Sequence, residues 1–269
     1  MGRRMSIAEK DLRLMLRLAN SPDDPDGQEP MPWSVLIGLR DLIRCDAVTF
    51  ILLDSQHCAI PFGQEIGFQP DCPVDDPAAF NAAFWCNYWS SPACAYPDTT
   101  GDLRTVTTAS DFLSDRQLRS SAMYCEYLRF FGGFREMMLC LPSRTGRTLR
   151  LLFWRGRGAD FSERDRSLLT LLRPHLHRAH TERMRALMPS PALSVRQKEL
   201  MELVAEGFTN GQIARRLSIS EATVRKHLEH VFARLEVTSR TAAVTKFRSD
   251  VPAFPITDEP QDWYLTVSA

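Results

Sequence analysis

A run of apolar residues at helical spacing near the C-terminus constrains this chain more than any other feature of its sequence. The spacing continues through residues 193–244 with only short breaks. Ser194 and Gln197, three residues apart, form a capping box that begins a first helix, and Gly207 ends it. The apolar positions of this helix are Leu200, Leu203 and Val204. The stretch therefore predicts a small helical domain.

Two further helices are expected so close together that they form a helix-turn-helix. Thr209 or Asn210 can cap the first of the two, and the small Ala214 lets another helix cross it closely. Ser220 caps the second. The inward positions of this second helix, at helical spacing, are Val224, Leu228, Val231 and Leu235.

The opposite face of that last helix has small and charged side chains. A rotation of about 100° per residue places Lys226 and Glu229 opposite the Val224 stripe, with Arg225 at the flank. Charged side chains on an exposed helix can read base edges or hold phosphates. The alternative is a solvated helix in an ordinary bundle, where mixed charge is common.

This stretch resembles the DNA-binding domain of LuxR-type (GerE-like) bacterial transcription regulators. The matching positions are Leu193, Ser194, Leu203, Ala205, Gly207, Asn210, Ile213, Ala214, Leu217, Ile219, Ser220, Thr223, Val224, His227, Leu235, Val237, Arg240 and Ala243. Gln197 stands where the family usually has Glu, and Gly211 with Gln212 stands where a charged pair is common. Neither departure removes a residue expected to face a groove.

The resemblance implies that this domain binds double-stranded DNA at a promoter or operator. The positions that face the major groove in the family are matched by Arg225, Lys226 and Glu229. The positions near the DNA backbone are matched by Thr223 and His227. The other residues that we predict to contact DNA are Thr209, Asn210, Ser220, Arg234 and Arg240. The helix beginning at Thr238 matches the one through which these domains often dimerise, which predicts a homodimer.

The length of 269 residues and the 44% hydrophobic content suit two domains. We predict a sensor and dimerisation domain at 1–186, a linker at 187–192, the DNA-binding domain at 193–249 and an acidic, disordered tail at 250–269. The net charge is zero, but residues 190–250 have 10 basic and 7 acidic side chains. Because this excess is small, the motif supports DNA binding more than the charge does.

The predicted tail has two interpretations. Residues 251–269 have three acidic side chains and no basic one, which favours disorder. Trp263, Tyr264 and Leu265 form an apolar cluster within it. The tail could instead dock on the DNA-binding domain or on RNA polymerase.

Before residue 187 the pattern alternates between helix and strand. Helices are expected over residues 6–19, 33–43, 77–91, 114–130 and 162–188. Strands are expected over residues 47–53, 58–62, 136–141 and 147–154. The apolar face of the first helix consists of Ala8, Leu12, Met15, Leu16 and Ala19, and it is expected to pack on the sensor domain or on a second subunit. This order predicts an α+β domain in which helices flank an antiparallel sheet.

The order is similar to that of a GAF/PAS-like sensor domain, and residues 161–176 (FSERDRSLLTLLRPHL) resemble the closing helix of such domains. The predicted fold class is therefore an α+β GAF/PAS-like sensor followed by an all-α four-helix LuxR-type helix-turn-helix domain. The resemblance implies a sequence-specific DNA-binding transcriptional regulator. A small-molecule effector or a protein partner would modulate it through the sensor.

An aromatic set is the candidate lining of a small-molecule pocket in the sensor. It consists of Phe84, Trp85, Tyr88, Trp89 and Tyr124. The alternative is that these rings fill the core, as aromatic residues at helical spacing usually do. Acyl-homoserine-lactone receptors share the architecture in outline, but their binding motif is not found in order, so that ligand is not predicted.

Two other functions compete with that of a regulator. Asp54 ends an apolar strand as a phosphoacceptor does, but the only Lys before residue 198 is Lys10, so a strand-end turn residue is expected. Cys58, Cys125 or Cys140 could act as a redox switch or as the nucleophile of a GAF-type thiol-dependent enzyme. No paired acid–base constellation stands out. We therefore predict no enzymatic activity and no cofactor.

The regulator is expected in the bacterial cytoplasm, with no membrane partner. Basic residues interrupt any apolar run in the first twenty positions, and the seven cysteines include no CxxC pair. No metal site is predicted, because His175, His177 and His180 lack the i, i+4 spacing that suits a metal and are expected to be exposed.

The predicted closing helix has an unusual number of leucines, namely Leu168, Leu169, Leu171, Leu172 and Leu176. They offer more apolar surface than one domain face needs. We therefore expect the sensor's terminal helices to contribute to the dimer. The alternative is that these leucines complete the sensor core.

Overall fold

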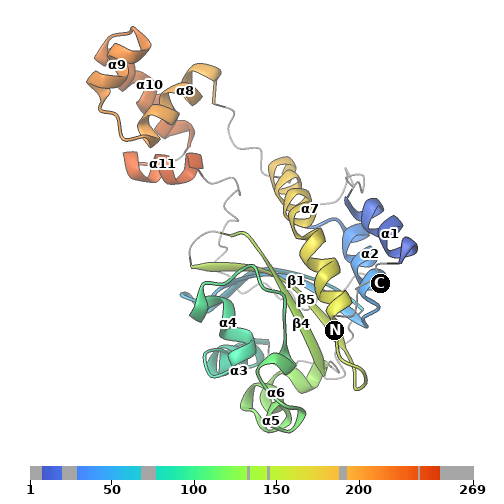
Figure 1. The fold of residues 1–269 in the computed structure, drawn as a ribbon. Coiled ribbons are helices and arrows are strands. Elements are labelled where there is room, and N and C mark those ends of the chain that lie inside the picture. Colours follow the sequence, from blue (N-terminus) through green and yellow to red (C-terminus); the bar gives the residue numbers. More distant parts are fainter. Residues whose placement is uncertain are drawn as a thin grey trace. The chain divides into compact units, whose positions relative to one another are not determined.

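The computed structural model describes residues 8–19, 29–67, 77–131, 134–143, 146–187, 193–235 and 237–248 (Figure 1). The chain divides into two compact units, with the boundary between Arg183 and Met184. The predicted tail, most of the predicted linker and the expected cap at Ser6 lie outside the described residues.

The N-terminal unit is built on a five-stranded antiparallel sheet of order β2-β1-β5-β4-β3. Its strands are β1 (Ala47–Asp54), β2 (Ala59–Ile66), β3 (Thr107–Thr108), β4 (Arg135–Leu141) and β5 (Arg147–Arg155). Every residue of β1 is buried, which explains the continuous apolar run in its sequence. The four predicted strands are confirmed, and β3 is a short addition at the edge.

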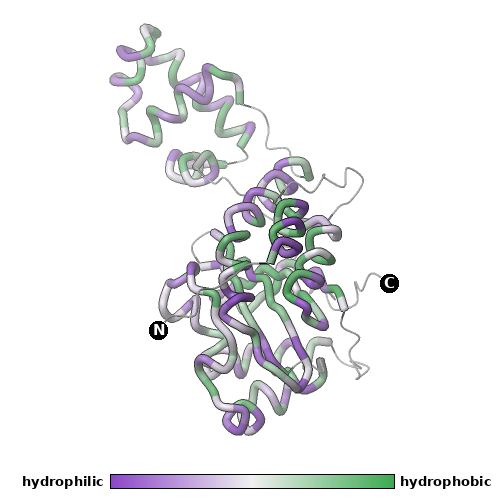
Figure 2. The backbone as a smooth tube through the Cα atoms, turned by 45° about the vertical axis from the view of Figure 1, so that its right-hand side comes forward, coloured by the Kyte–Doolittle hydropathy of each residue, from purple (hydrophilic) through white to green (hydrophobic). Residues whose placement is uncertain are grey.

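Helices cover both faces of this sheet, so the unit has two hydrophobic cores (Figure 1). One face is covered by α1 (Glu9–Ala19), α2 (Trp33–Ile43) and α7 (Glu163–Leu187). The other is covered by α3 (Pro77–Tyr88), α4 (Pro92–Thr100), α5 (Asp115–Ser120), α6 (Ala122–Glu126) and the short turn η2 (Leu128–Phe131). A second short turn, η1 (Ala109–Asp111), follows β3. Hydrophobic residues run along the central strands, whereas the helices alternate with hydrophilic positions (Figure 2).

Two of the predicted helices differ from the structure for local reasons. The single helix expected over residues 114–130 is broken at Ser121, because the Ser121 hydroxyl accepts a hydrogen bond from the Tyr124 amide and so begins α6. Pro92, expected to end a helix, instead stands at the first position of α4. Proline suits that position because the missing amide hydrogen has no partner there in any helix.

The predicted apolar face of α1 packs on the N-terminal unit only in part, because Met15 contacts its core but the leucines of that face do not. Leu12 and Leu16 are 46% and 62% exposed, whereas Asp11 and Leu18 are buried. A buried carboxylate needs a partner, and Asp11 has one in Arg164 of α7, at 2.7 Å. This ion pair and the packing of Leu18 into the core decide which face of α1 turns inward.

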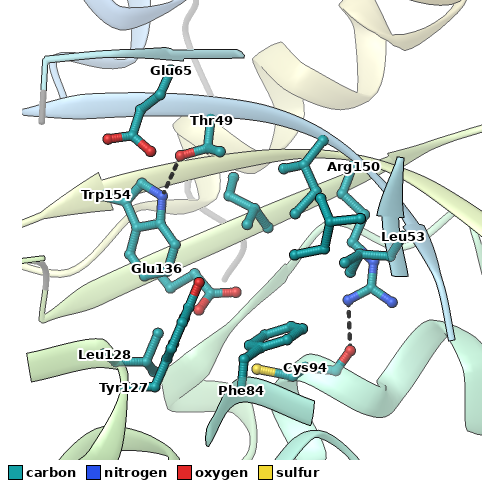
Figure 3. A pocket seen from close by; sticks show the side chains of 13 residues that line it. Thr49, Leu53, Glu65, Phe84, Cys94, Tyr127, Leu128, Glu136, Arg150 and Trp154 are labelled. Carbon is teal, nitrogen blue, oxygen red and sulfur yellow. Dashed lines mark hydrogen bonds between the residues drawn. The ribbon is translucent and has the colours of Figure 1, made fainter. Parts of the chain in front are cut away.

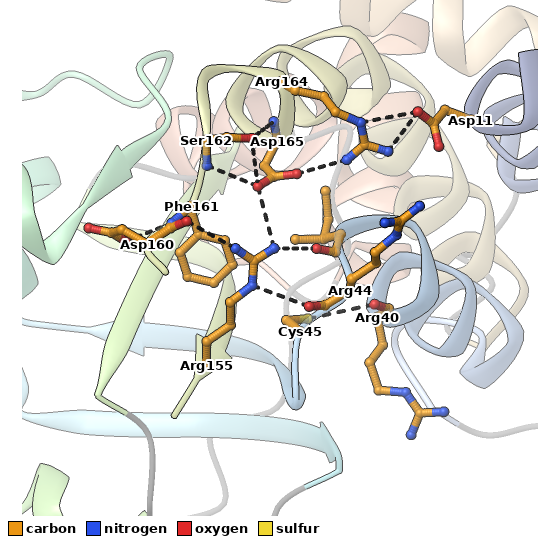
Figure 4. A network of polar contacts seen from close by, with 11 residues as sticks. Asp11, Arg40, Arg44, Cys45, Arg155, Asp160, Phe161, Ser162, Arg164 and Asp165 are labelled. Carbon is orange, nitrogen blue, oxygen red and sulfur yellow. Dashed lines mark hydrogen bonds and ion pairs between the residues drawn. The ribbon is translucent and has the colours of Figure 1, made fainter. Parts of the chain in front are cut away.

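The same ion pair belongs to a polar network that joins α7 to α1 and to the end of α2 (Figure 4). Asp165 accepts a hydrogen bond from the Ser162 amide (2.9 Å) and pairs with Arg164 (2.9 Å). Arg155 of β5 donates to the Ile43 carbonyl (2.5 Å) and lies 3.4 Å from Asp165. The network therefore fixes the start of α7 against the end of the central strand β5 and against α2.

The leucines of α7 mostly complete the core of the N-terminal unit. Leu168, Leu169, Leu172 and Leu176 are at most 1% exposed, and only Leu171 of the set, at 53%, faces solvent. The expectation of a large surplus apolar surface on this helix is therefore wrong. One apolar position remains for an intermolecular contact.

The expectation that His180 is exposed is also wrong. It is 2% exposed, its Nδ1 lies 2.9 Å from the Pro30 carbonyl oxygen, and its ring packs edge-on to Phe50. Burial lowers the pKa of His180 to about 4. His180 is therefore a neutral core residue at physiological pH, whereas His175 is exposed as expected.

The C-terminal unit consists of α8 (Val195–Ala205), α9 (Asn210–Leu217), α10 (Glu221–Arg234) and α11 (Arg240–Arg248), which confirms four helices. The predicted capping box of Ser194 and Gln197 is formed at the start of α8. Val224, Leu228 and Val231 of α10 are at most 5% exposed in the core. Capping and apolar period, both local in the sequence, thus suffice to define this unit.

Candidate DNA-binding surface and sensor cavity

The turn between α9 and α10 is fixed by short-range backbone and side-chain contacts. Ser218 ends α9 in the left-handed conformation (φ +54°), and the Ile219 amide donates to the Ala214 carbonyl oxygen at 3.0 Å. Ser220 then caps α10 by accepting from the Thr223 amide at 3.0 Å. The direction in which α10 leaves α9 is therefore set by the chain itself.

The outward face of α10 presents Arg225, Lys226 and Glu229, all of them exposed. Within the described parts of the chain, none of the three forms an ion pair or a side-chain hydrogen bond. The donors of Arg225 and Lys226 and the acceptors of Glu229 thus remain available for base edges or phosphates.

Several other predicted DNA-contact residues have internal roles in the structure. The Arg240 guanidinium donates to Asn210 Oδ1 at 3.0 Å and to the Phe208 carbonyl oxygen at 2.5 Å, so it ties α11 to the start of α9. Arg234 donates to Gln197 Oε1 at 3.2 Å. Arg234 and Arg240 therefore join helices as well as adding positive charge.

The remaining predicted contacts lie at helix starts. Thr209 accepts from the Gln212 amide as the cap of α9, and the Ser220 and Thr223 hydroxyl oxygens lie 2.7 Å apart. His227 is half-buried on α10. These residues position the helices, whereas the three exposed charged residues of α10 form the surface suited to reading DNA.

The N-terminal unit contains a small cavity of about 50 Å³, partly open to solvent, between the sheet and the α3–α4 side (Figure 3). Strand residues form one wall: Thr49, Ile51, Leu53, Ile60, Glu65, Glu136, Arg150, Leu152 and Trp154. The opposite wall consists of Phe84, Cys94, Tyr127 and Leu128. We call this space the sensor cavity. Its lining is mainly apolar and aromatic, as in sites for small molecules.

The predicted pocket residues are only partly brought together here. Phe84 lines the cavity, while Tyr88, whose ring packs beside Phe84, is fully buried and accepts a hydrogen bond from Arg150. Trp85 and Tyr124 pack against the neighbouring core but are not in the lining. Trp89 is 54% exposed, so its assignment to a pocket is corrected. Helical spacing alone could not distinguish these orientations.

Arg150 is a buried cation with a complete set of partners. It is 2% exposed and donates to Thr148 Oγ1 (2.8 Å), the Cys94 carbonyl oxygen (2.6 Å) and Asp98 Oδ2 (2.6 Å), as well as to the Tyr88 hydroxyl. The ion pair with Asp98 offsets the cost of burying the charge. Arg150 thus anchors α4 to β5.

Sequence reasoning missed the two acidic residues of the sensor cavity. Glu65 of β2 and Glu136 of β4 are 6% and 7% exposed. Burial raises the pKa of each carboxyl to about 7; the Arg150 charge opposes the shift at Glu136, and a hydrogen bond with Thr49 opposes it at Glu65. One sequence feature could have indicated them: a charged residue next to an apolar run in a strand, such as Glu136 in REMMLCL.

The cysteines and Asp54 bear on the alternative functions. Burial raises the pKa of Cys94 to about 12 and of Cys140 to about 11, so these thiols hold little thiolate at neutral pH. Cys58 and Cys125 are exposed. Asp54 is buried and paired with Arg147 at 2.9 Å, a structural role at the strand end.

Residues 191–247 match the family described as bacterial regulatory proteins, luxR family (GerE). The C-terminal domain belongs to the LuxR family. The HTH-type transcriptional regulator YhjB of Escherichia coli is 48% identical to this chain over 52 residues. The match covers 19% of this chain and 26% of YhjB. The monoamine regulon transcriptional regulator of Klebsiella aerogenes is 34% identical over 91 residues, or 34% of this chain and 40% of that protein. The chain thus spans less than half the length of these curated LuxR-family relatives.

Solved structures show a similar fold over most of the chain. The structure of SdiA in complex with octanoyl-rac-glycerol matches with a TM-score of 0.58 and 17% identity, over 92% of this chain and 97% of SdiA. A crystal structure of Escherichia coli SdiA matches with a TM-score of 0.53 and 17% identity, over 88% and 94% of the two chains. A mixed α/β N-terminal unit followed by a LuxR-family helical domain is therefore an arrangement that SdiA shares.

Neither a membrane-spanning helix nor a metal-binding cluster is found among the described residues. None of their helices is both long and apolar enough to cross a membrane. Nor do these residues contain a group of three or more His, Cys, Asp or Glu side chains placed to hold a metal ion.

Proposed function

We propose that this protein is a bacterial transcriptional regulator that reads DNA with α10 and responds to a small molecule bound in the sensor cavity. The observation that supports it best is the outward face of α10, where Arg225, Lys226 and Glu229 are exposed and unpaired within the described chain of a LuxR-family domain. DNA reading of this kind places the protein in the cytoplasm. The antiparallel sheet flanked by helices supports a GAF/PAS-like class for the N-terminal unit.

Binding selection on genomic fragments tests the function and identifies the operator. The full chain is expected to enrich a small set of fragments that share a motif with two related half-sites, since a dimer reads two half-sites. Enrichment without any shared motif would argue against sequence-specific regulation.

Lys226→Ala and Glu229→Ala separate base reading from phosphate binding. Each is expected to weaken operator binding by about 1–3 kcal/mol and to leave binding to random DNA nearly unchanged, because a lost base contact removes specificity only. Both side chains are exposed, so the free energy of unfolding should stay within about 0.5 kcal/mol. Fluorescence anisotropy on operator and random duplexes measures the difference.

Two controls sharpen this test. Lys198→Ala removes an exposed lysine from α8 and should leave operator preference intact. Val224→Ala should lower stability first and affect binding only through folding. The assignment of faces is wrong if Lys226→Ala keeps operator preference while a folded Leu228→Ala variant loses it.

We also propose that the protein is a homodimer to which the α1–α2–α7 face contributes. The exposed large apolar side chains of that face are Leu12, Leu16, Ile37 and Leu171. Leu12→Asp or Leu171→Asp is expected to raise the dimer dissociation constant about tenfold or more, because apolar burial at the contact is lost. Sedimentation velocity measures the change.

The matched control for the dimer is Val195→Asp, at a 77% exposed position of α8. It should leave the dissociation constant unchanged. If the two leucine variants associate as the unaltered chain does, this face has no part in the dimer.

A further inference from the structure

The sensor cavity is lined by more acidic than basic side chains. Among its lining residues, Glu65 and Glu136 are acidic and Arg150 is the one basic side chain. Both glutamates are more than nine-tenths buried, and they reach the cavity from β2 and β4. Because carboxylates are costly to bury without a cation, what surrounds them determines what the cavity can bind.

Arg150 does not supply the missing cation. Each nitrogen of its guanidinium already donates to a protein partner: Nε to Thr148, Nη1 to the Cys94 carbonyl oxygen, and Nη2 to Asp98 and Tyr88. Figure 3 shows the guanidinium turned toward Cys94. Asp98, at 2.6 Å, already forms an ion pair with this guanidinium.

The two glutamates have few partners of their own. In the part of the chain that the structure describes, the Glu136 carboxyl has no hydrogen bond or ion pair, and Arg150 acts on it only through its charge. Glu65 lies opposite Thr49 in the β1–β2 pair and takes a hydrogen bond from it. Thr49 Oγ1 in turn accepts from Trp154 Nε1 at 3.1 Å. Acceptor capacity therefore remains at both carboxyl groups.

Aromatic rings surround these carboxyl groups. Figure 3 shows the Trp154 side chain between Glu65 and Glu136, with Tyr127 and Phe84 on the opposite wall. Aromatic faces attract cations through their quadrupole, and the attraction grows where water is excluded. The rest of the wall is aliphatic. Acidic groups and aromatic faces favour a cation, and the aliphatic wall favours an apolar body attached to it.

We infer that the sensor cavity binds a small protonated amine, with the ammonium group held by the Glu136 carboxyl and the apolar body packed against the aliphatic and aromatic wall. This inference rests on the proposal that the cavity is the effector site. It adds the chemical class of the ligand. An anionic ligand would be repelled by the glutamates, and a neutral one would leave acceptor capacity unused.

The test uses the purified full chain and two sets of isosteric probes at pH 7.5. One set is hexylamine, hexan-1-ol and hexanoate; the other is 2-phenylethylamine, 2-phenylethanol and phenylacetate. Titration calorimetry should give each amine a dissociation constant at least tenfold lower than its alcohol, with no measurable binding of either acid. An alcohol that binds as tightly as its amine overturns the inference.

Glu136→Gln and Glu65→Gln keep the side-chain volume and remove the charge. Glu136→Gln is expected to weaken amine binding at least tenfold. Glu65→Gln is expected to weaken it less, because the Trp154 side chain lies between the two carboxyl groups. Both should change alcohol binding less than threefold. Glu182→Gln, at an exposed position of α7, is the matched control and should change neither. Unchanged amine binding in Glu136→Gln contradicts the inference. If either variant does not fold, the comparison of amine, alcohol and acid in the unaltered chain still decides.

The outcomes separate this inference from the proposed function. Binding of an alcohol or acid without its amine refutes the amine inference and retains the effector site. Binding of none of the six probes counts against both the inference and the effector site. Operator binding by the same protein preparation tests the DNA-reading part independently.

Discussion

Arg150→Met is expected to lower the free energy of unfolding of the N-terminal unit by about 3–5 kcal/mol. The side chain is 2% exposed, and its removal leaves Asp98 as a buried charge without its ion-pair partner. The Cys94 carbonyl and the Tyr88 hydroxyl lose hydrogen bonds at the same time. Urea unfolding followed by tryptophan fluorescence measures the loss, since no tryptophan lies in residues 193–248.

A double-mutant cycle shows whether the ion pair is responsible. Adding Asp98→Asn to Arg150→Met should recover part of the lost stability, because the unpaired buried charge is then gone. The control is Arg13→Met, whose partner Glu9 is an exposed neighbour on α1. Its cost should be below about 0.5 kcal/mol. A loss of less than about 1 kcal/mol for Arg150→Met would show that burial of this pair is not what holds α4 to β5.

Operator binding is expected to weaken about a thousandfold between 50 and 200 mM salt. A dimer that neutralises about six phosphates, three per protomer, gives a log–log salt slope of roughly −5. Exposed basic side chains such as Arg216 on α9 and Arg225 on α10 are suited to these contacts. Anisotropy titrations at four or more salt concentrations measure the slope.

Arg216→Ala should reduce the magnitude of that slope by about 2, one contact in each protomer. Arg116→Ala removes an equal charge from an exposed position of α5, in the N-terminal unit, and should leave the slope unchanged. A slope near zero for the unaltered chain would point to a partner other than DNA.

The helix-turn-helix was predictable because its determinants are local. The capping residues Ser194, Thr209 and Ser220 each act within three positions, and the buried residues of α10 repeat at helical spacing. The outward position of Lys226 follows from the same period. The internal pairing of Arg240 with Asn210 did not follow, because these residues are 30 positions apart.

In the N-terminal unit, the pattern predicted most elements but not the faces that they bury. Leu12 and Asp11 illustrate the difference, because hydrophobicity alone favours burying the leucine. The structure buries Asp11, since Arg164 arrives from a helix 153 positions away to pair with it. Such a pairing cannot be read from the residues around Asp11.

Local sequence patterns predicted the LuxR-family domain, the caps and most strands and helices, but not α4, β3 or the break before α6. The content of the sensor cavity depended on how the chain folds. Glu65 and Glu136 lie on β2 and β4, which are separated in the sheet by β1 and β5, and the partners of Arg150 across the cavity wall lie 52 to 62 positions away. Helical and strand periods indicate which face of a single segment is exposed to solvent. The ionisation and pairing of a buried side chain depend instead on segments that come into contact only after the sheet has formed.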